Sequence, residues 1–444
     1  MTLTDRSVAA PPDIRESERL WARAIERIPN GTQTLAKGPG QHVRGVSPKY
    51  LARGRGAKVW DVDGNSYIDW SMAIGPVILG YGDPDVDAAI RRQLQDGITF
   101  SLMHPLEIDV AERIHAMIPN AEAVRFGKTG AEVTSAAVRL ARAFTGRDLV
   151  LCCGYHGWHD WSIAVTDRHR GIPEAVRALT HTFPYNDLGV LEEALDENVA
   201  CVILEPVVFD EPQPGFLEGV RELCRRAGAL LVFDEMWTGF RLAAGGAQEK
   251  YGVIPDLATY SKAIANGMPL SVLTGRRDVM QLLEQDVFFF TTFGGEALSL
   301  AAARACLDQI RVRRVPAVLD ELGRVLRDGF QRLTADLGLE SVVRCQGAPC
   351  RTTVVFRSDR ADPLLMRSFV QQELVCRGIL WGGSHVLSAA HTADDVGALL
   401  DVYAEILPEL AEALSDGSLP RRMRGQTVEP VFRRTSDFHT RPRR

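Results

Sequence analysis

Lysine is scarce in this chain of 444 residues, and arginine supplies most of its 51 basic residues. A reaction that needs a primary amine therefore has few candidates, which are Lys37, Lys49, Lys58, Lys128, Lys250 and Lys262. Acidic residues slightly outnumber basic ones, and the formal net charge of -6 gives no reason to expect nucleic acid as a partner.

Paired cysteine motifs and long apolar runs are also missing. The eight cysteines form no C-x-x-C pair, and Cys152, Cys153 and Cys201 lie inside apolar runs, which favours buried, reduced thiols over disulfides or zinc ligands. No window reaches the roughly 18 consecutive apolar residues of a membrane span, and the start has no apolar core of signal-peptide length. We therefore expect a cytoplasmic protein without a membrane partner.

The order of patterns along the chain predicts an α/β fold. Helical periodicity covers residues 16–29, and two strand-like pieces follow at 57–64 and 66–71. From about residue 85, helical segments alternate with apolar runs at 148–153, 200–206 and 230–235, which is typical of a mainly parallel central sheet. From about residue 311 the pattern changes to that of a smaller α+β domain.

These changes of pattern predict four regions. Residues 1–75 are expected to form an N-terminal segment of helix, loop and small strands that belongs to the small domain. Residues 76–310 are expected to form the large α/β domain, and residues 311–420 the C-terminal α+β domain. Residues 421–444 are rich in arginine and proline, which predicts a basic, solvated tail or a surface strap rather than a nucleic-acid arm.

Two reactive side chains follow strand-like runs. The apolar run at 230–233 ends in Asp234, and Lys262 follows within ATYSKAIANGMP. Buried parallel strands deliver their last residues to the carboxyl edge of the sheet. A carboxylate for a pyridine nitrogen and a lysine for an imine are what pyridoxal 5′-phosphate (PLP) requires. We therefore predict that Asp234 and Lys262 are catalytic, although a strand-end cap and a surface charge are the simpler interpretations.

A phosphate cradle is predicted where GKTGAEVTSAAVRLARAF begins a helix. Thr129, Gly130 and Ala131 would offer a hydroxyl and backbone amides to a dianionic phosphate, aided by the helix dipole. Many helices start with glycine, and Lys128 could point either to the phosphate or to water. The predicted buried face of this helix consists of Val133, Ala137, Leu140, Ala141 and Phe144.

A platform for a flat ring is predicted in CCGYHGWHDW. Tyr155, followed by His156, would lie at the carboxyl edge of the sheet and stack on the cofactor ring. Met236 would lie against the ring, or simply fill the core. Glu205 ends another apolar run and would orient Lys262 or the cofactor hydroxyl through water. Its alternative is a purely structural role. His156, His159 and Asp160 lack a further ligand pattern, so no metal is expected.

These stretches resemble the class III aminotransferases of PLP fold type I, and most closely glutamate-1-semialdehyde aminomutase and its aminotransferase relatives. The matching segments are VWDVDGNSYIDW, RLARAFTGRD, YHGWHD, PGFLEGVRELC, FDEMWTGFR and SKAIANGMP. The resemblance implies a large domain with a mainly parallel sheet and a smaller α+β terminal domain, with Lys262 as the imine lysine and Asp234 as the partner of the ring nitrogen. It also implies a homodimer with a shared active site, in which Thr292 serves the cofactor phosphate of the neighbouring copy.

The chain departs from the aminomutase pattern at three places. The phosphate loop has Ala131 where the aminomutase has a threonine. Lys37 stands where the aminomutase has an arginine that grips the substrate carboxylate, and a point charge selects a carboxylate less well than a planar fork. The acidic gate is missing, and Ser384 and His385 stand in its place. Lys37, Trp158 and His385 are the predicted substrate contacts.

The expected reaction is transamination from a small amino-acid donor, glutamate or glutamine, to an aldehyde or ketone. An oxidised aminosugar or aminoglycoside from antibiotic biosynthesis is one expected acceptor. A 2,1-aminomutase or an epimerase that uses the same proton shuttle remains an alternative, as does a non-catalytic scaffold that retains the fold.

Overall fold

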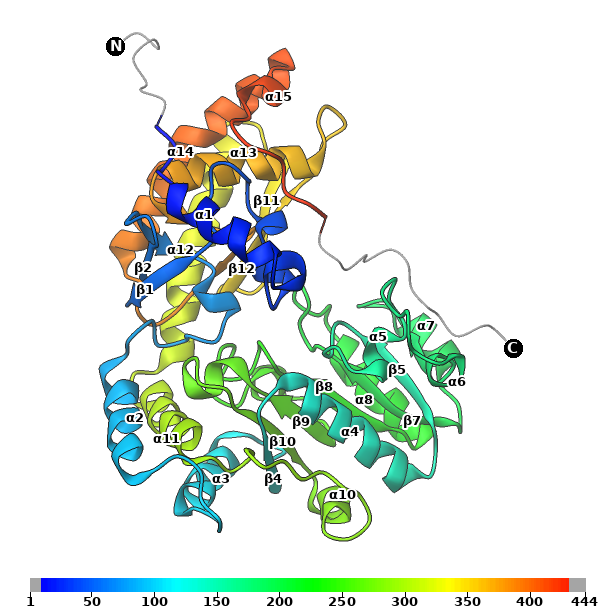
Figure 1. Cartoon of the computed structure of the whole chain (residues 1–444). Coiled ribbons are helices and arrows are strands. Elements are labelled where there is room, and N and C mark those ends of the chain that lie inside the picture. The colour runs from blue at the N-terminus through cyan, green and yellow to red at the C-terminus, as the bar shows by residue number, and fades with distance from the viewer. Residues whose placement is uncertain (1–8, 431–444) are drawn as a thin grey trace. The chain divides into compact units, whose positions relative to one another are not determined.

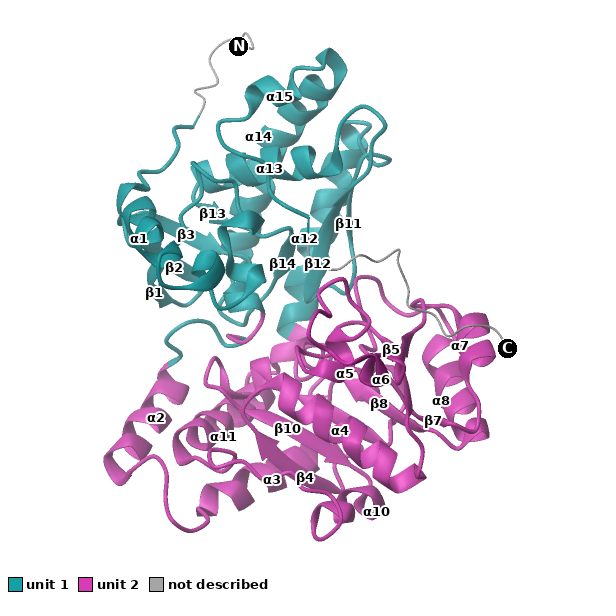
Figure 2. Ribbon diagram, turned by 45° about the vertical axis from the view of Figure 1, so that its right-hand side comes forward, with its two compact units in different colours: residues 1–74, 78–83, 318–432 teal, residues 75–77, 84–317, 433–444 magenta. Residues whose placement is uncertain are grey.

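A computed structural model describes residues 9–430 of the chain. These residues form two compact units (Figure 2). Unit 1 contains the described residues up to 74, residues 78–83 and residues from 318 onward; unit 2 contains residues 75–77 and 84–317. The first and last described segments of the chain therefore belong to the same unit.

Unit 2 is built around a seven-stranded sheet with the order β4-β10-β9-β8-β7-β5-β6. Strand β10 is antiparallel to its two neighbours, and all other pairs are parallel, so the predicted mainly parallel sheet is confirmed. Strands β7 and β8 are buried along their whole length, which explains their unbroken apolar runs. The strands are β4 (Ala123–Gly127), β5 (Leu149–Cys153), β6 (Thr180–Thr182), β7 (Val199–Leu204), β8 (Leu230–Asp234), β9 (Leu257–Tyr260) and β10 (Ser271–Gly275).

Helices cover this sheet, and Figure 1 shows α4 lying along it. The apolar face of α4 packs with residues of β5, β7, β8, β9 and β10 in one core cluster. Phe144 corrects the predicted buried face, because its ring lies in the last turn, is 40% exposed and stacks under Arg276. The helices of unit 2 are α2 (Pro84–Asp96), α3 (Pro105–Met117), α4 (Gly130–Thr145), α5 (Asp160–Ile163), α6 (Glu174–Arg177), α7 (Leu188–Ala194), α8 (Phe216–Ala227), α9 (Ala247–Tyr251), α10 (Arg277–Met280) and α11 (Ala297–Val312).

Unit 1 contains two small sheets. One has the order β1-β2-β3-β13, and the other has the order β11-β12-β14. The Asp63-Gly64 turn joins β2 and β3, where the Asp61 carboxylate accepts the N–H groups of Asp63 and Asn65. The strands are β1 (Leu51–Arg55), β2 (Lys58–Asp61), β3 (Ser66–Asp69), β11 (Val343–Gln346), β12 (Arg351–Phe356), β13 (Ile379–Leu380) and β14 (Ser384–Val386).

The helices of unit 1 include the predicted N-terminal one, which ends at Ile25, before the predicted Ile28. They are α1 (Arg15–Ile25), α13 (Pro363–Cys376), α14 (Ala393–Asp416) and α15 (Leu419–Arg422), together with most of α12 (Val315–Asp336). No helix within residues 9–430 is long and apolar enough to cross a membrane.

The cysteine side chains are mostly buried, as the sequence predicts. All eight cysteines lie within the described residues, none of them forms a disulfide, and seven are buried. Burial raises the pKa of both Cys152 and Cys201 to about 12, so these thiols stay protonated and unreactive at neutral pH.

Two helical glycines of unit 1 give a matched pair of substitutions. A Cβ on Gly323 in α12 would lie 1.9 Å from the carbonyl oxygen of Pro349, whereas a Cβ on Gly397 in α14 would meet nothing within 4 Å. We expect Gly323→Ala to destabilise the protein by about 1–3 kcal/mol, because backbone must move. Gly397→Ala should stabilise it by up to about 1 kcal/mol, because alanine favours the helix. Urea denaturation midpoints measure both, and equal midpoints would contradict the close packing at Gly323.

Candidate active site

The parallel pairing of β8 with β9 brings the two predicted catalytic residues to one edge of the sheet. Asp234 is the last residue of β8 and pairs with Thr259, while Lys262 follows the end of β9 by two residues. Both residues belong to unit 2 and lie at the carboxyl ends of neighbouring strands, where open α/β sheets bind ligands.

Lys262 sits on an unusual backbone. Its φ is +44°, a value that lysine rarely adopts, and it begins the short 3₁₀ turn Lys262–Ala265. Such strain costs about 1–3 kcal/mol and persists only where the surroundings hold it. Here Ala263, Ile264 and Ala265 are buried, and the Ser261 hydroxyl donates to the Leu270 carbonyl at 2.7 Å. The turn therefore fixes the Cα–Cβ direction of the lysine.

Asp234 is held by a buried histidine. The ring Nδ1 of His156 lies 2.7 Å from Oδ2 of Asp234, and both side chains are 1% exposed. The Met236 N–H donates to Oδ1 at 3.1 Å, so each carboxylate oxygen is oriented by a separate donor. The sequence placed His156 beside the cofactor without a role, and the structure makes it the partner of Asp234.

The neighbouring carboxylate, that of Glu235, has a structural role. Glu235 accepts the N–H groups of Ala247 and Gln248 at 2.8 and 3.0 Å, and so caps α9. The Thr238 hydroxyl also donates to it. Burial raises the pKa of Glu235 to about 7. Asp234 and Glu235 thus carry out different tasks although they are adjacent in sequence.

The predicted phosphate cradle forms the start of α4. Thr129 is the N-cap residue, and Gly130 and Ala131 are in the first turn, where N–H groups have no acceptor within the helix. Glu132 accepts the N–H groups of Lys128 and Thr129 at 2.7 and 3.1 Å, so these two amides are occupied. The Gly130 and Ala131 amides and the Thr129 hydroxyl are the groups suited to an anion.

Glycine is required around this cradle because neighbouring groups approach closely. A Cβ on Gly130 would lie 2.9 Å from the Met236 sulfur, and one on Gly157 would lie 2.6 Å from Cβ of Ala131. Gly157 also has a φ of +104°. Met236 thus packs directly on the cradle, which joins the end of β8 to the start of α4.

Lys128 has a partner that its sequence context did not reveal. Its Nζ lies 2.9 Å from Oε1 of Glu296, and both side chains are largely buried. Glu296 in turn caps α11 by accepting the N–H groups of Leu298 and Ser299. The amine of Lys128 therefore ties the cradle to the start of α11 rather than pointing to water.

Tyr155 and Glu205 lie at the ends of adjacent strands. Glu205 follows β7, and its carboxylate accepts the Tyr155 N–H at 2.7 Å, directly after β5. A Cβ on Gly154 would collide with Glu205 at 2.7 Å, so the turn between β5 and Tyr155 is closely packed. Glu205 thereby positions the backbone of Tyr155, while the Tyr155 ring is partly exposed.

Thr292 lines a pocket on unit 2. This pocket of about 200 Å³ is formed by residues from two segments, 99–107 and 291–296. Large apolar side chains beside it are strongly exposed, and Leu102 and Met103 are 80% and 83% exposed. The Lys128–Glu296 pair connects this pocket to the phosphate cradle, because Glu296 also lines the pocket.

The three predicted substrate contacts have different surroundings. Trp158 is an exposed residue of unit 2, with its ring edge on His159. Lys37 is an exposed residue of unit 1 that ends the 3₁₀ turn η2 (Leu35–Lys37). His385 is fully buried in unit 1, where its ring nitrogens lie 2.9 Å from the Thr352 hydroxyl and 2.8 Å from the Tyr403 hydroxyl.

The surroundings of His385 correct its predicted role. Both ring nitrogens are occupied by neighbouring hydroxyls, and the residue has no exposed surface, so it has no polar atom to offer to a substrate. It is instead part of the core of unit 1, between the rings of Trp70 and Tyr403.

The residues of unit 2 fit PLP. A buried, oriented carboxylate at Asp234 suits a ring nitrogen, the start of α4 suits a phosphate, and Lys262 lies at the same sheet edge. No group of three or more His, Cys, Asp or Glu side chains with the arrangement of a metal site occurs in the part of the chain that the structure describes.

Comparison with known proteins identifies the family. A family model described as aminotransferase class-III matches residues 42–386. The chain belongs to this family. It is similar to the 3-aminobutyryl-CoA aminotransferase of Cloacimonas acidaminovorans, with 32% identity over 414 residues that cover 90% of this chain and 99% of that protein. The glutamate-1-semialdehyde 2,1-aminomutase of Methanothermobacter thermautotrophicus is 35% identical over 426 residues, with coverage of 89% and 99%.

Solved structures agree with this result. The PLP internal aldimine form of the Sphingopyxis sp. MTA144 FumI protein has a TM-score of 0.83 and 30% identity, with coverage of 92% of this chain and 99% of that one. An omega-transaminase from Sphaerobacter thermophilus has a TM-score of 0.79 and 26% identity, with coverage of 91% and 100%. The chain is a PLP-dependent transaminase of fold type I, as the sequence predicted.

Two acids that support this site, Glu132 and Glu296, are absent from the predicted site residues. Glu132 follows Thr129 by three residues in the T-x-x-E pattern of a capping box, so its position could have been read from the sequence. Glu296 pairs with Lys128 from a distant part of the chain, and no local pattern indicates that contact.

The buried His385 predicts a loss of stability in acid. Burial lowers its pKa to about 3, whereas the same ring in the unfolded chain takes up a proton near pH 6.5. Between these values the unfolded state binds one more proton than the folded state. The free energy of unfolding should therefore fall by about 1.4 kcal/mol for each unit by which the pH is lowered. Urea midpoints measured from pH 7 to pH 5 should show a shallower pH dependence in His385→Gln. An unchanged slope would contradict the buried, neutral state of this ring.

Proposed function

We propose that this protein moves an amino group from an amino-acid donor, glutamate or glutamine, to an aldehyde or ketone acceptor. The observation that carries the proposal is the meeting of Lys262, Asp234 and the start of α4 at one sheet edge in unit 2. A scaffold without catalysis would not need the strained backbone at Lys262 or the buried His156–Asp234 pair.

Each group has a task in this reaction. PLP, when bound, supplies a carbonyl for amines and a ring that withdraws electrons. Lys262 would hold the cofactor through its amine and, when that amine is free, would carry the α-proton of the substrate. Asp234, oriented by His156, would keep a proton at the ring nitrogen. Tyr155 and Met236 would lie against the ring.

The phosphate and the second copy complete the proposed site. Thr129, Gly130 and Ala131 bind the phosphate in one copy, and Thr292 of a second copy adds a hydroxyl. The exposed apolar side chains beside the Thr292 pocket support a homodimer, because large exposed apolar patches commonly mark interfaces. Size-exclusion chromatography with light scattering tests this assembly, and a monomer at micromolar concentration would contradict it.

We propose that the substrate meets Lys37 and Trp158. Lys37 provides a point charge, which grips a carboxylate less selectively than arginine does. Asp210 is exposed in the loop after β7, while Glu211 lies 3.4 Å from Lys250. The carboxylate of Asp210 could attract a cationic acceptor. An oxidised aminosugar or aminoglycoside, as in antibiotic biosynthesis, has the required positive charge and carbonyl group.

A 2,1-aminomutase is the second candidate, because relatives of that name are 35% identical to this chain. The two functions differ in their need for an external donor. Purified protein loaded with pyridoxamine phosphate should convert an amino-aldehyde without a keto acid if it is a mutase. A transaminase instead forms 2-oxoglutarate stoichiometrically from glutamate, and a screen of oxidised aminosugars should identify its acceptor.

Substitution of Lys262 provides the direct test of the catalytic assignment. Lys262→Ala should lower turnover by about a hundredfold or more, because the group that moves the proton is removed. Lys58→Ala is the control, because Lys58 is an exposed residue of β2 in unit 1. Borohydride reduction followed by peptide mapping should label Lys262 in the wild type. Full turnover in Lys262→Ala, or a label on another lysine, would refute the assignment.

A further inference from the structure

The last described residues of the chain form a strap across unit 1. We call residues 423–429 the C-terminal strap, and they run antiparallel to residues 40–46, the clamped segment. The Gln426 N–H donates to the Arg44 carbonyl at 3.0 Å, and the Glu429 N–H donates to the Gly40 carbonyl at 2.7 Å. The side chains of Arg44 and Glu429 also form an ion pair. The strap therefore contacts both ends of the clamped segment.

The strap is also anchored in the core. Val428 is 3% exposed and belongs to an apolar cluster with Val43 and Val46 of the clamped segment. Its N–H donates to the Ser368 hydroxyl of α13 at 2.9 Å. Burial of one such valine contributes about 1.5–3 kcal/mol. These residues of the predicted tail or strap thus pack on unit 1, while residues 431–444 lie outside the described residues.

Helix α13 holds the clamped segment from the other side through a buried amide. Gln371 accepts the Val43 N–H at 2.9 Å and donates to the Gln41 carbonyl at 3.1 Å. The same side chain donates to the Trp381 carbonyl at 2.9 Å. The backbone of the clamped segment is therefore bonded to α13 at residues 41 and 43 and to the strap at residues 40 and 44.

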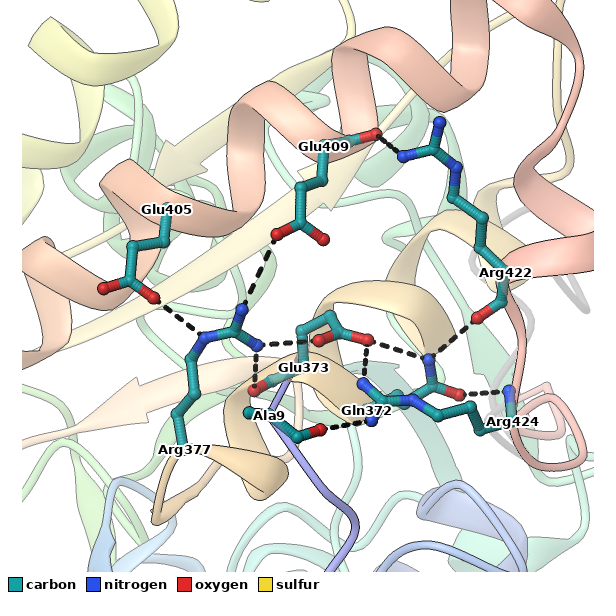
Figure 3. A network of polar contacts seen from close by, with 8 residues as sticks. All are labelled: Ala9, Gln372, Glu373, Arg377, Glu405, Glu409, Arg422 and Arg424. Atoms are coloured by element: carbon teal, nitrogen blue, oxygen red, sulfur yellow. Dashed lines mark hydrogen bonds and ion pairs between the residues drawn. The ribbon is translucent and has the colours of Figure 1, made fainter. Parts of the chain in front are cut away.

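A polar network fixes the start of the strap (Figure 3). The Arg424 N–H donates to Gln372 at 2.6 Å, and its guanidinium pairs with the buried Glu373. Arg424 also donates to the Ala9 carbonyl at 2.5 Å, and Arg377 lies 2.7 Å from Glu373. Since Glu373 is 3% exposed, its charge depends on these two arginines.

The clamped segment continues directly from the turn that carries Lys37. Lys37 ends η2, and the turn η3 (Pro39–Gln41) overlaps the clamped segment. The strap is bonded to the carbonyl groups of Gly40 and Arg44, which follow Lys37 by three and seven residues.

We infer that the C-terminal strap is a positioning element for Lys37, and that it thereby sets the affinity for the anionic group of the substrate. This inference rests on the proposed function for the role of Lys37, but the hold of the strap on the clamped segment does not. Lys37 is exposed on a short turn. The position of its amine therefore depends on how firmly the backbone on either side of the turn is fixed.

A methyl group added at Gly425 is expected to displace the strap. A Cβ at this position would lie 2.4 Å from the Arg44 carbonyl oxygen and 2.7 Å from Cγ1 of Val43. In Gly425→Ala we expect amide exchange of peptides within residues 35–46 to quicken by about tenfold, because this segment opens more often when the strap no longer holds its carbonyl groups. The matched control is Gly397→Ala, which places a methyl group in open space in the same unit.

Kinetics with L-glutamate as the probe separate positioning from folding. Gly425→Ala should raise KM for L-glutamate by about fivefold and leave kcat within about twofold, because the effect is on binding of the anionic group. In a Lys37→Ala background the same substitution should have no further effect on KM, because the residue that it positions is gone. The absorbance of the bound cofactor should not change in either variant.

Two truncations repeat the test without a new side chain. A chain that ends at Pro430 keeps the strap and should behave as the wild type does. One that ends at Gly425 keeps Arg424, the partner of the buried Glu373, and should behave as Gly425→Ala does. Unchanged exchange of residues 35–46 in Gly425→Ala and in the shorter truncation would overturn the inference. Faster exchange with an unchanged KM, or an equal rise of KM in the Lys37→Ala background, would also overturn it.

Failure of the proposed function gives a different result. If the wild type does not transaminate with L-glutamate or L-glutamine, the proposed function fails. The exchange measurement then still decides whether the strap holds the segment after Lys37.

Discussion

The parallel pairing of β7, β8 and β9 is the constraint on which the rest of unit 2 depends. It places Glu205, Asp234 and Lys262 at the same edge, although they are far apart in sequence. Strand β5 pairs with β7 and adds Tyr155 beside Glu205. Because parallel strands all end at one edge, a change in their order would separate these groups without altering any local segment.

Close approach of small residues then fixes the geometry at that edge. Gly130 leaves room for Met236, and Gly157 leaves room for Ala131, so the start of α4 can lie against the ends of β5 and β8. The positive φ of Lys262 is maintained by the buried residues that follow it. Rigid backbone of this kind orients a reactive amine at little further entropic cost when a ligand binds.

Buried polar side chains of one helix in unit 1 bond to the segments that pack against it. Ser368, Gln371, Gln372 and Glu373 of α13 are all buried, and each bonds to a segment outside the helix. Buried polar groups are stable only when they are paired, so these contacts specify which segments lie against α13. The first and last described segments meet there, and the position of the Lys37 turn follows from that meeting.

The sequence by itself determined the α/β pattern, the strand ends that carry Asp234 and Lys262, and the glycine-marked start of α4. It could do so because apolar runs, turn residues and capping patterns are local. Tertiary structure alone decided that His156 orients Asp234, that Lys128 pairs with Glu296, that His385 is a core residue and that residues 423–429 cover the segment after Lys37. These features depend on contacts between residues distant in sequence and on burial, which periodicity and spacing do not encode.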